Sequence, residues 1–362
     1  MKKQKSIMLL LTYSCNLSCS YCYEPKQQKH RMTFESAKRY ICEQVAMSKD
    51  KYYSFEIQFM GGEPLMEFPL IQQIAYWIWE EKPFAKEYVL FAQTNGTLLN
   101  EMMKSWFVCH KTQFFLALSM DGTMDMQNTN RSGSYFFVDT DFFVNNWPTQ
   151  NVKMTISPQT IDKLSDGVIY LHKIGFRHIA ADLAMGKSIK WTSEDLRVYR
   201  NELDKLVNFY IENPDLQPFS MLRIDPTVIL SLSKNIHKTC SCGEDLVCVD
   251  WDGKTYACHL FSPISITKEK ARNSNEIYDF ANHAQFISEL CLNCRLNVVC
   301  NRCYGMNYIC TNDVTIPSAF HCNAFKIRFY ASCKLYIEYS CLHKDFKNVE
   351  KIKAIINSLK IG

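Results

Sequence analysis

The stretch Cys-Asn-Leu-Ser-Cys-Ser-Tyr-Cys-Tyr occupies residues 15–23, directly after the apolar run 7–11. Its cysteines, Cys15, Cys19 and Cys22, are separated by three and then by two residues. Three thiolates on one short loop can bind three irons of a [4Fe–4S] cluster and leave the fourth iron open. A zinc site is the alternative, but zinc usually takes a fourth Cys or His nearby, and this loop contains none. The spacing therefore favours a cluster that binds a further ligand over one that only stores electrons.

The composition of the chain is that of a protein with a large core. Its 362 residues are 47% hydrophobic and 13% aromatic, enough for one large domain and a smaller one. The net charge is only +4 and no basic run alternates with aromatics, so we expect no nucleic-acid partner. The run 7–11 is too short for a signal peptide, and no stretch could span a bilayer, so we expect no membrane partner. Seventeen cysteines then indicate metal in a reducing, cytoplasmic setting.

Six apolar, β-branched or aromatic runs alternate with helical patterns along the first half of the chain. The expected strands are residues 6–12, 54–60, 88–93, 114–120, 152–156 and 178–183. Amphipathic segments such as 33–49 and 69–81 lie between them. This alternation is typical of an α/β fold with a parallel sheet.

Unusual residues gather where the expected strands end. The cysteine loop follows the first strand, 61–64 the second, 94–96 the third and 121–122 the fourth. Active sites of (β/α) barrels are built at that end of the strands. We therefore predict a partial (β/α)6 TIM-type barrel, with its site at the carboxyl ends of the strands.

The cysteine loop, together with Asn16, Leu17, Tyr21 and Tyr23, resembles the signature loop of the radical S-adenosylmethionine (SAM) superfamily. In that family SAM chelates the open iron, and reductive cleavage of SAM gives a 5′-deoxyadenosyl radical that abstracts a substrate hydrogen. The resemblance implies SAM and a [4Fe–4S] cluster as cofactors, with Tyr21 near SAM. The cofactors supply the difficult step, and the protein orients them.

Gly61, Gly62, Glu63 and Pro64 form a motif that, taken alone, indicates only a turn. One βα unit after the cysteine loop, it resembles the family segment whose backbone and glutamate receive the amino group of SAM. Glycine permits close approach of a ligand to the backbone, and a carboxylate accepts hydrogen bonds from an ammonium group.

Ser119, Asp121, Gly122 and the later Arg131 resemble the family pattern in which serine and arginine contact the SAM carboxylate. An arginine suits this role because its planar fork binds a carboxylate bidentately. Residues 127–128 are Gln-Asn where the family often has His-Asp. The alternative is a turn followed by an exposed arginine.

A second group of cysteines lies in the last third of the chain. It comprises Cys240, Cys242, Cys248, Cys258, Cys291, Cys294, Cys300, Cys303, Cys310 and Cys322. The dipeptide 252–253, Asp-Gly between apolar runs, predicts a β-hairpin. The spacing from Cys291 to Cys303, with the later Cys322, resembles the SPASM domain, which binds auxiliary [4Fe–4S] clusters in radical SAM enzymes. A zinc ribbon over 291–303 is the alternative.

The resemblance implies two auxiliary clusters, and so three clusters in all. The first would be held by Cys242, Cys248, Cys258 and Cys303, and the second by Cys291, Cys294, Cys300 and Cys322. The family usually has three residues, not two, before the cysteine that corresponds to Cys303, so Cys240 or Cys310 are substitutes for it.

The resemblance covers residues 5–325. We expect a radical SAM core over 1–225, a SPASM domain over 226–325 and a helical tail over 326–362, with an amphipathic helix at 346–360. The remaining cysteines, Cys42, Cys109, Cys333 and Cys341, are expected to be core or surface thiols.

By motif, the chain resembles anaerobic sulfatase-maturating enzymes and the maturases of ribosomally made peptides. In the sulfatase group an aspartate after the third auxiliary cysteine acts as base, whereas here His259 follows Cys258. Histidine can take a proton near neutral pH. We therefore favour an oxidoreductase that modifies a peptide or protein, with His259 as its base and the auxiliary clusters accepting an electron. Formylglycine formation on a sulfatase and a non-catalytic electron carrier are the alternatives.

The expected partners are a peptide or protein substrate and an external electron donor such as flavodoxin or ferredoxin. Because the cysteine loop begins at residue 15, we expect no leader-binding domain before it. Recognition of a leader would then come from a separate protein or from the aromatic-rich middle region, or would not occur.

Overall fold

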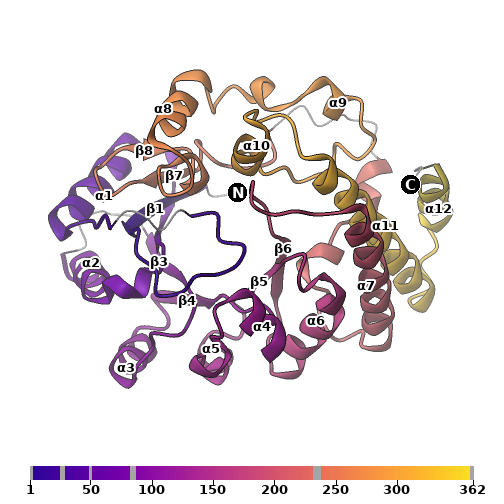
Figure 1. The fold of residues 1–362 in the computed structure, drawn as a ribbon, viewed down its shortest axis with the longest axis horizontal. Helices are drawn as coiled ribbons and strands as arrows, with labels where there is room; N and C mark the ends of the chain where they lie inside the picture. The colour runs from indigo at the N-terminus through magenta and orange to yellow at the C-terminus, as the bar shows by residue number, and fades with distance from the viewer. Residues whose placement is uncertain (1–2, 25–28, 49–50, 82–86, 231–237, 359–362) are drawn as a thin grey trace. The chain divides into compact units, whose positions relative to one another are not determined.

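The computed structural model describes residues 3–24, 29–48, 51–81, 87–230 and 238–358. These residues form two compact units, and their elements are labelled in Figure 1. The first unit comprises residues 1–119, 134–150 and 241–282, and the second comprises 120–133, 151–240 and 283–362. The units alternate along the chain, so their boundaries differ from those of the predicted domains. The predicted domains stay predictions.

The first unit contains a six-stranded sheet in the order β4-β3-β2-β1-β7-β8. Its strands are β1 (Gln4–Thr12), β2 (Ser54–Gly61), β3 (Glu87–Thr94), β4 (Phe114–Leu118), β7 (Leu246–Val249) and β8 (Thr255–Tyr256). β1 to β4 are parallel neighbours, as the alternating pattern predicts. The run 7–11 is completely or almost completely buried in β1, which explains why it is continuously apolar.

Helices of the first unit cover this sheet and bury an aromatic core. They are α1 (Phe34–Ser48), α2 (Phe68–Glu81), α3 (Glu101–Cys109), α5 (Thr140–Asn146) and α8 (Lys268–Ile277), with short 3₁₀ helices η2 (Pro64–Glu67), η3 (Tyr135–Phe137) and η7 (His259–Phe261). The rings of Phe59 and Phe114 stack 5.6 Å apart, and Phe107 packs edge-on against Phe114. The predicted end of the first helix at Lys49 lies outside the described residues.

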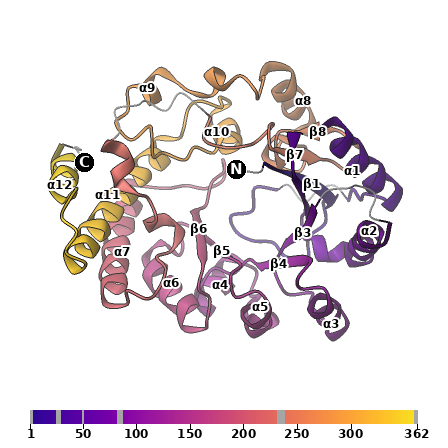
Figure 2. The same ribbon diagram turned by 180° about the vertical axis from the view of Figure 1, so that it is seen from behind.

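The hairpin predicted around residues 252–253 is present, and it joins the main sheet. β7 pairs antiparallel with β8, with Cys248 opposite Tyr256. β7 also pairs in parallel with β1, with Cys248 opposite Met8 (Figure 2). This second pairing was not predicted, because nothing local in either segment specifies a partner some 240 residues away.

The second unit contains a two-stranded parallel sheet and most of the long helices. The strands are β5 (Val152–Ile156) and β6 (Ile179–Leu183). The helices are α4 (Met124–Asn130), α6 (Leu164–Lys173), α7 (Ser193–Glu212), α9 (Glu289–Leu292), α10 (Tyr304–Thr311), α11 (Ala319–Leu342) and α12 (Val349–Ser358), with 3₁₀ helices η4 (Ile161–Lys163), η5 (Ser220–Leu222), η6 (Pro226–Leu230) and η8 (His283–Phe286). All six predicted parallel strands therefore exist, four in one sheet and two in the other. The α/β fold class is confirmed.

The C-terminal helices pack within the second unit. α11 lies along α7 in both ribbon views, and the Tyr339 hydroxyl donates a hydrogen bond of 3.1 Å to the carbonyl oxygen of Tyr210. Ile352 and Ile355 of α12 pack in one core cluster with Cys333 of α11. The predicted amphipathic helix is thus present, although its predicted end at Lys360 lies outside the described residues.

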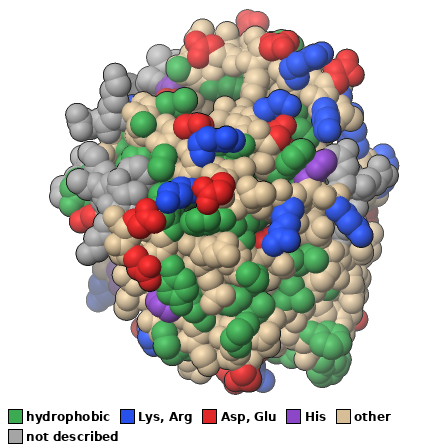
Figure 3. All heavy atoms as spheres, turned by 90° about the vertical axis from the view of Figure 1, so that its left-hand side faces the viewer, with side chains coloured by type: hydrophobic (Ala, Val, Ile, Leu, Met, Phe, Trp, Pro, Cys, Tyr) green, Lys and Arg blue, Asp and Glu red, His purple; other side chains and the backbone are tan. Residues whose placement is uncertain are grey.

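One face of the described chain is mixed in charge. Figure 3 shows acidic and basic side chains interspersed over one face, which agrees with the small net charge. Among the helices that the structure describes, none has the length and apolarity needed to cross a membrane.

Candidate functional site

The cysteine loop begins where β1 ends, and backbone contacts attach it to the turn after β2. The amide of Gly62 donates to the carbonyl oxygen of Thr12 at 3.0 Å, and the amide of Glu63 donates to that of Ser14 at 2.9 Å. Gly61 has φ +146°, and a Cβ there would lie 2.1 Å from the oxygen of Thr12; at Gly62 it would lie 2.4 Å from that of Ser14. Both positions therefore require glycine, because the cysteine loop passes directly against them.

Glu63 joins the turn after β2 to the loop after β3. The residue is only 2% exposed. Its carboxylate accepts hydrogen bonds from the Thr94 hydroxyl at 2.7 Å, the Asn95 amide at 2.8 Å and the Leu65 amide at 3.1 Å. These bonds fix the carboxylate at the carboxyl ends of β2 and β3. The predicted contact of Glu63 with the ammonium group of SAM stays a prediction. No signal in the sequence indicated this second, positioning role.

Asn16 attaches the cysteine loop to the loop after β3. Its amide nitrogen donates to Thr97 Oγ1 at 2.8 Å, and its oxygen accepts from Asn95 Nδ2 at 2.9 Å. Within the loop, the amide of Cys22 donates to the carbonyl oxygen of Cys19 at 3.1 Å. Cys15, Cys19 and Cys22 are all half-buried. The loop is therefore fixed by its neighbours while its three thiols are partly accessible.

Two further predicted residues of the first unit lie on or beside this loop and the strand ends. Ser119 follows β4, where its amide donates to the carbonyl oxygen of Thr94 at 2.8 Å and its hydroxyl accepts from Gln93 Nε2 at 3.0 Å. Tyr21 lies in the turn between Cys19 and Cys22 and is half-buried. Their predicted contacts with SAM stay predictions.

Arg131, in the second unit, is paired with a buried carboxylate. Its Nε lies 3.0 Å from Oδ1 of Asp121, which is fully buried, and Arg131 itself is 7% exposed. Asp121 also accepts from the Thr155 amide at 2.9 Å and from Asn130 Nδ2 at 3.1 Å. The alternative of an exposed arginine after a turn is therefore wrong. Gln127, which replaces the family histidine, accepts a hydrogen bond of 2.9 Å from the Asp121 amide.

His259 lies against the cysteine loop. Its Nε2 is 2.9 Å from the hydroxyl oxygen of Tyr23. Tyr23 directly follows Cys22, and His259 directly follows Cys258, so this contact links the sequence neighbours of two predicted cluster ligands. The role of His259 as a base stays a prediction, and Tyr23 is the partner that sequence reasoning did not identify.

The predicted first auxiliary site is divided between the two units. Cys242, Cys248 and Cys258 belong to the first unit and are buried around the β7–β8 hairpin. Burial raises the pKa of the Cys248 thiol well above its usual value. Cys303 and its substitutes Cys240 and Cys310 belong to the second unit, so the choice of the fourth ligand stays a prediction.

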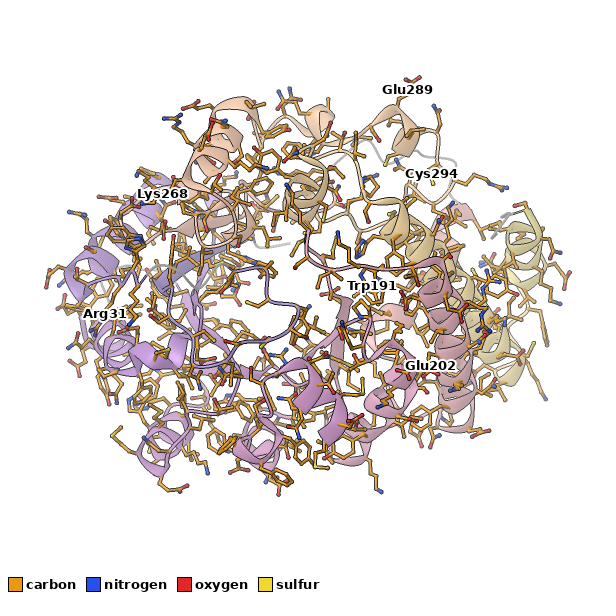
Figure 4. All side chains as sticks on the ribbon, viewed as in Figure 1. Arg31, Trp191, Glu202, Lys268, Glu289 and Cys294 are labelled. Carbon is orange, nitrogen blue, oxygen red and sulfur yellow. The ribbon has the colours of Figure 1, made fainter. Side chains whose placement is uncertain are left out.

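The predicted second auxiliary site lies wholly in the second unit. Cys291, Cys294, Cys300 and Cys322 all line one cavity of about 560 Å³. Cys294 is on the loop after α9 (Figure 4), and Cys322 is in the first turn of α11. Burial raises the pKa of Cys300 to about 12, and the nearby Arg302 opposes this rise. Cys303, which is predicted for the first auxiliary site, lines the same cavity, so the division of these cysteines between two sites stays a prediction.

These four cysteines and their cavity suit an anionic iron–sulfur cluster. Among the residues that the structure describes, no three Cys, His, Asp or Glu side chains converge on the position of one metal ion. The thiolates of a cubane bind different irons and therefore lie farther apart than the ligands of one ion. The cavity also contains Arg302, whose buried Nε and Nη2 have no hydrogen-bond partner in the described part of the chain. Such a cation is matched by a cluster that carries negative charge.

Comparison with known sequences gives matches over both units. A family model described as a 4Fe-4S single cluster domain matches residues 6–136. An uncharacterised protein of Methanocaldococcus jannaschii is 29% identical over 59% of this chain and 76% of its own. A cysteine-type anaerobic sulfatase-maturating enzyme of Clostridium novyi is 21% identical over 82% of this chain and 87% of its own. A radical SAM cyclopropyl synthase of Paramaledivibacter caminithermalis is 28% identical over 35% of this chain and 32% of its own.

Solved structures show the same fold. The structure titled native anSMEcpe with bound AdoMet and Cp18Cys peptide has a TM-score of 0.69 at 19% identity, covering 99% of this chain and 100% of that one. Streptococcus suis SuiB bound to its precursor peptide SuiA has a TM-score of 0.53 at 13% identity, covering 84% and 73%. Together with the sequence matches, these likenesses support the superfamily that the cysteine loop predicts, that of the radical SAM enzymes.

Proposed function

We propose that this chain modifies a peptide or protein by radical SAM chemistry. The observation that carries the proposal is the geometry of the cysteine loop. The loop is held at the end of β1 by the 61–64 turn and by Asn16, while its three thiols are partly accessible. Three accessible thiols on a rigid loop suit a cluster that binds one further ligand.

Each residue of the loop region has a proposed role in this reaction. Cys15, Cys19 and Cys22 would hold the cluster, and Gly61 and Gly62 keep the loop in place. When bound, the cluster and SAM supply a 5′-deoxyadenosyl radical that removes a hydrogen atom from the substrate. Glu63 is proposed to accept hydrogen bonds from the ammonium group of SAM, since its carboxylate is already fixed by Thr94 and Asn95.

His259 is the proposed base. Oxidation of the substrate radical to a closed-shell product releases one electron and one proton. The imidazole can take the proton, and its Nε2 is oriented by the Tyr23 hydroxyl at 2.9 Å. The auxiliary cysteines are proposed to hold the two clusters that take the electron.

The substrate is proposed to be a peptide to be cross-linked or otherwise modified. In support, histidine stands after Cys258, where the sulfatase-maturating group has an aspartate. The second candidate, formylglycine formation on a sulfatase, is favoured by the likeness to the Clostridium novyi enzyme over 82% of this chain. Flavodoxin or ferredoxin as donor and a separate leader-binding protein are proposed partners of the first activity.

The proposal is tested with anaerobically reconstituted protein, dithionite and SAM. We expect release of 5′-deoxyadenosine, measured by liquid chromatography, and its complete loss in Cys15→Ala, Cys19→Ala and Cys22→Ala. Cys109→Ala is the matched control, because Cys109 is exposed and has no predicted ligand role. Normal cleavage in any of the three loop variants would refute the proposal.

The two candidate substrates are separated in a second assay. Peptides with a sulfatase-type Cys or Ser motif and precursor peptides encoded beside the gene are incubated with the enzyme and analysed by mass spectrometry. A new aldehyde on the sulfatase peptide would establish the second candidate, and a cross-link in a precursor peptide would establish the first.

A further inference from the structure

One arginine in the four-cysteine cavity of the second unit is buried with part of its guanidinium unpaired, while the side chain also interacts with Tyr304. Arg302 is 6% exposed, and its Nε and Nη2 form no hydrogen bond in the described part of the chain. Leaving buried N–H donors unpaired costs stability, and the cost is larger for a charged group. Such a guanidinium is retained where it faces an anion.

The position of Arg302 is fixed by its backbone. Its amide donates to Thr239 Oγ1 at 3.1 Å, and the Thr239 amide donates to the Tyr304 hydroxyl at 2.8 Å. Tyr304 is itself almost completely buried. The side chain lines the same cavity as Cys291 and Cys300, and its charge acts on both thiols. The guanidinium is therefore held beside the cysteines and cannot move to solvent without disturbing this core.

We propose that Arg302 raises the reduction potential of the cluster that Cys291, Cys294, Cys300 and Cys322 would hold. This inference rests on the proposed function, which assigns those four thiols to a cluster. Four thiolates around a [4Fe–4S]2+ core carry a net charge of −2, and uptake of one electron, without a proton, makes it −3. A buried positive charge stabilises the more negative form more strongly. Its two unpaired N–H groups are also donors for sulfur.

The consequence concerns electron flow during the proposed reaction. The substrate radical gives up one electron to an auxiliary cluster and one proton to a base. By favouring the reduced form, Arg302 makes the second auxiliary site the better electron acceptor. The second auxiliary site would then accept the electron because of the charge of Arg302 as well as because of its four thiolates.

Two other arginines show why the effect is assigned to Arg302. Arg295 follows Cys294 directly, but it is exposed and donates to Ser358 Oγ, so solvent and salt screen its charge. Arg328 lines the same cavity, but its guanidinium lies over the ring of Phe325, 5.5 Å from the centroid. Arg295→Gln is therefore a matched control of the same charge change beside a ligand.

The test is an EPR-monitored redox titration combined with iron analysis. The background is the variant with Cys15, Cys19 and Cys22 all replaced by Ala, so that only auxiliary signals remain. In this background the Arg302→Gln variant should keep its iron. The reduction potential of one of the two auxiliary clusters should fall by at least about 59 mV, which is a tenfold change in the equilibrium constant for reduction. Arg302→Lys keeps the charge but loses the planar pair of donors, so its shift should be smaller. Arg295→Gln should shift neither step.

The outcomes separate the inference from the proposed function. Absence of auxiliary iron before Arg302 is changed would overturn the assignment of the cysteines, and the inference with it. Retained iron with both potentials unchanged in Arg302→Gln would overturn the inference alone. If Arg302→Gln loses iron, Arg302→Lys decides: a lowered potential in one step supports the inference, and an unchanged potential overturns it.

Discussion

The cysteine loop of the first unit and the four-cysteine cavity of the second unit use the same side chain in different settings. The loop presents three half-buried thiols within eight residues and is held by backbone and amide contacts at the ends of β1, β2 and β3. The cavity is lined by the four predicted ligands between residues 291 and 322, by Cys303 and by a buried arginine. The first arrangement suits binding of an external ligand, and the second suits a fully ligated cluster. The number of thiols and the buried arginine beside the second set distinguish the two regions, because most thiols of both are half-buried.

The largest expected difference is between ligands of the two regions. Cys15→Ala should abolish SAM cleavage, whereas Cys294→Ala should leave it within about threefold while product formation is lost, because only the loop cluster would bind SAM. Each variant should lose about four irons of about twelve. The measurements are 5′-deoxyadenosine release and iron content. Equal loss of SAM cleavage in both variants would remove the functional distinction between the regions.

The next effect tests the support of the loop. In Gly62→Ala the added Cβ would lie 2.4 Å from the Ser14 oxygen, so the cysteine loop must move. We expect SAM cleavage to fall at least a hundredfold, about 2.7 kcal/mol in the barrier. Gly133→Ala is the control, because Gly133 also has a positive φ but a Cβ there meets no atom within 4 Å. A Gly62→Ala variant as active as Gly133→Ala would show that the close approach is not needed.

A smaller effect is expected from Asn16→Ala. This variant loses the hydrogen bonds to Asn95 and Thr97, which together are worth about 1–3 kcal/mol. The cysteine ligands remain, so iron content should be unchanged while the KM for SAM rises about tenfold. Steady-state kinetics with varied SAM measure the rise. An unchanged KM would show that the loop is rigid without this contact.

The smallest effect concerns stability in the second unit. Burial lowers the pKa of His172 below 6.5, and its ring nitrogens bond to the Phe176 carbonyl oxygen and the Tyr210 hydroxyl, both at 2.9 Å. The unfolded chain therefore binds a proton at a higher pH than the folded one, so this contribution is complete above 6.5 and declines as the pH falls below it. His172→Gln should flatten the dependence of urea unfolding on pH around 6 and leave SAM cleavage at neutral pH unchanged. If the variant keeps the wild-type dependence of unfolding on pH, that dependence comes from groups other than His172.

The sequence by itself determined the strands and the cysteine motifs. The run 7–11 is apolar throughout because β1 is buried on both sides, and such local patterns are readable without a structure. Likewise, short spacing places Cys15, Cys19 and Cys22 on one loop, whatever the rest of the chain does. The α/β class follows from these local features, as does the prediction of the radical SAM superfamily that the sequence matches support.

Only the tertiary structure decided how distant segments meet. Three such meetings join residues that no local pattern relates. They are the pairing of β7 with β1, the contact between Tyr23 and His259, and the shared cavity of Arg302 and Cys322. Each depends on which surfaces pack together and on which buried polar groups find partners, and these are properties of the whole folded chain. Glu63 depends on both the sequence and the tertiary structure. Its motif can be recognised in the sequence, whereas its hydrogen bonds to the loop after β3 form only when β2 and β3 lie side by side.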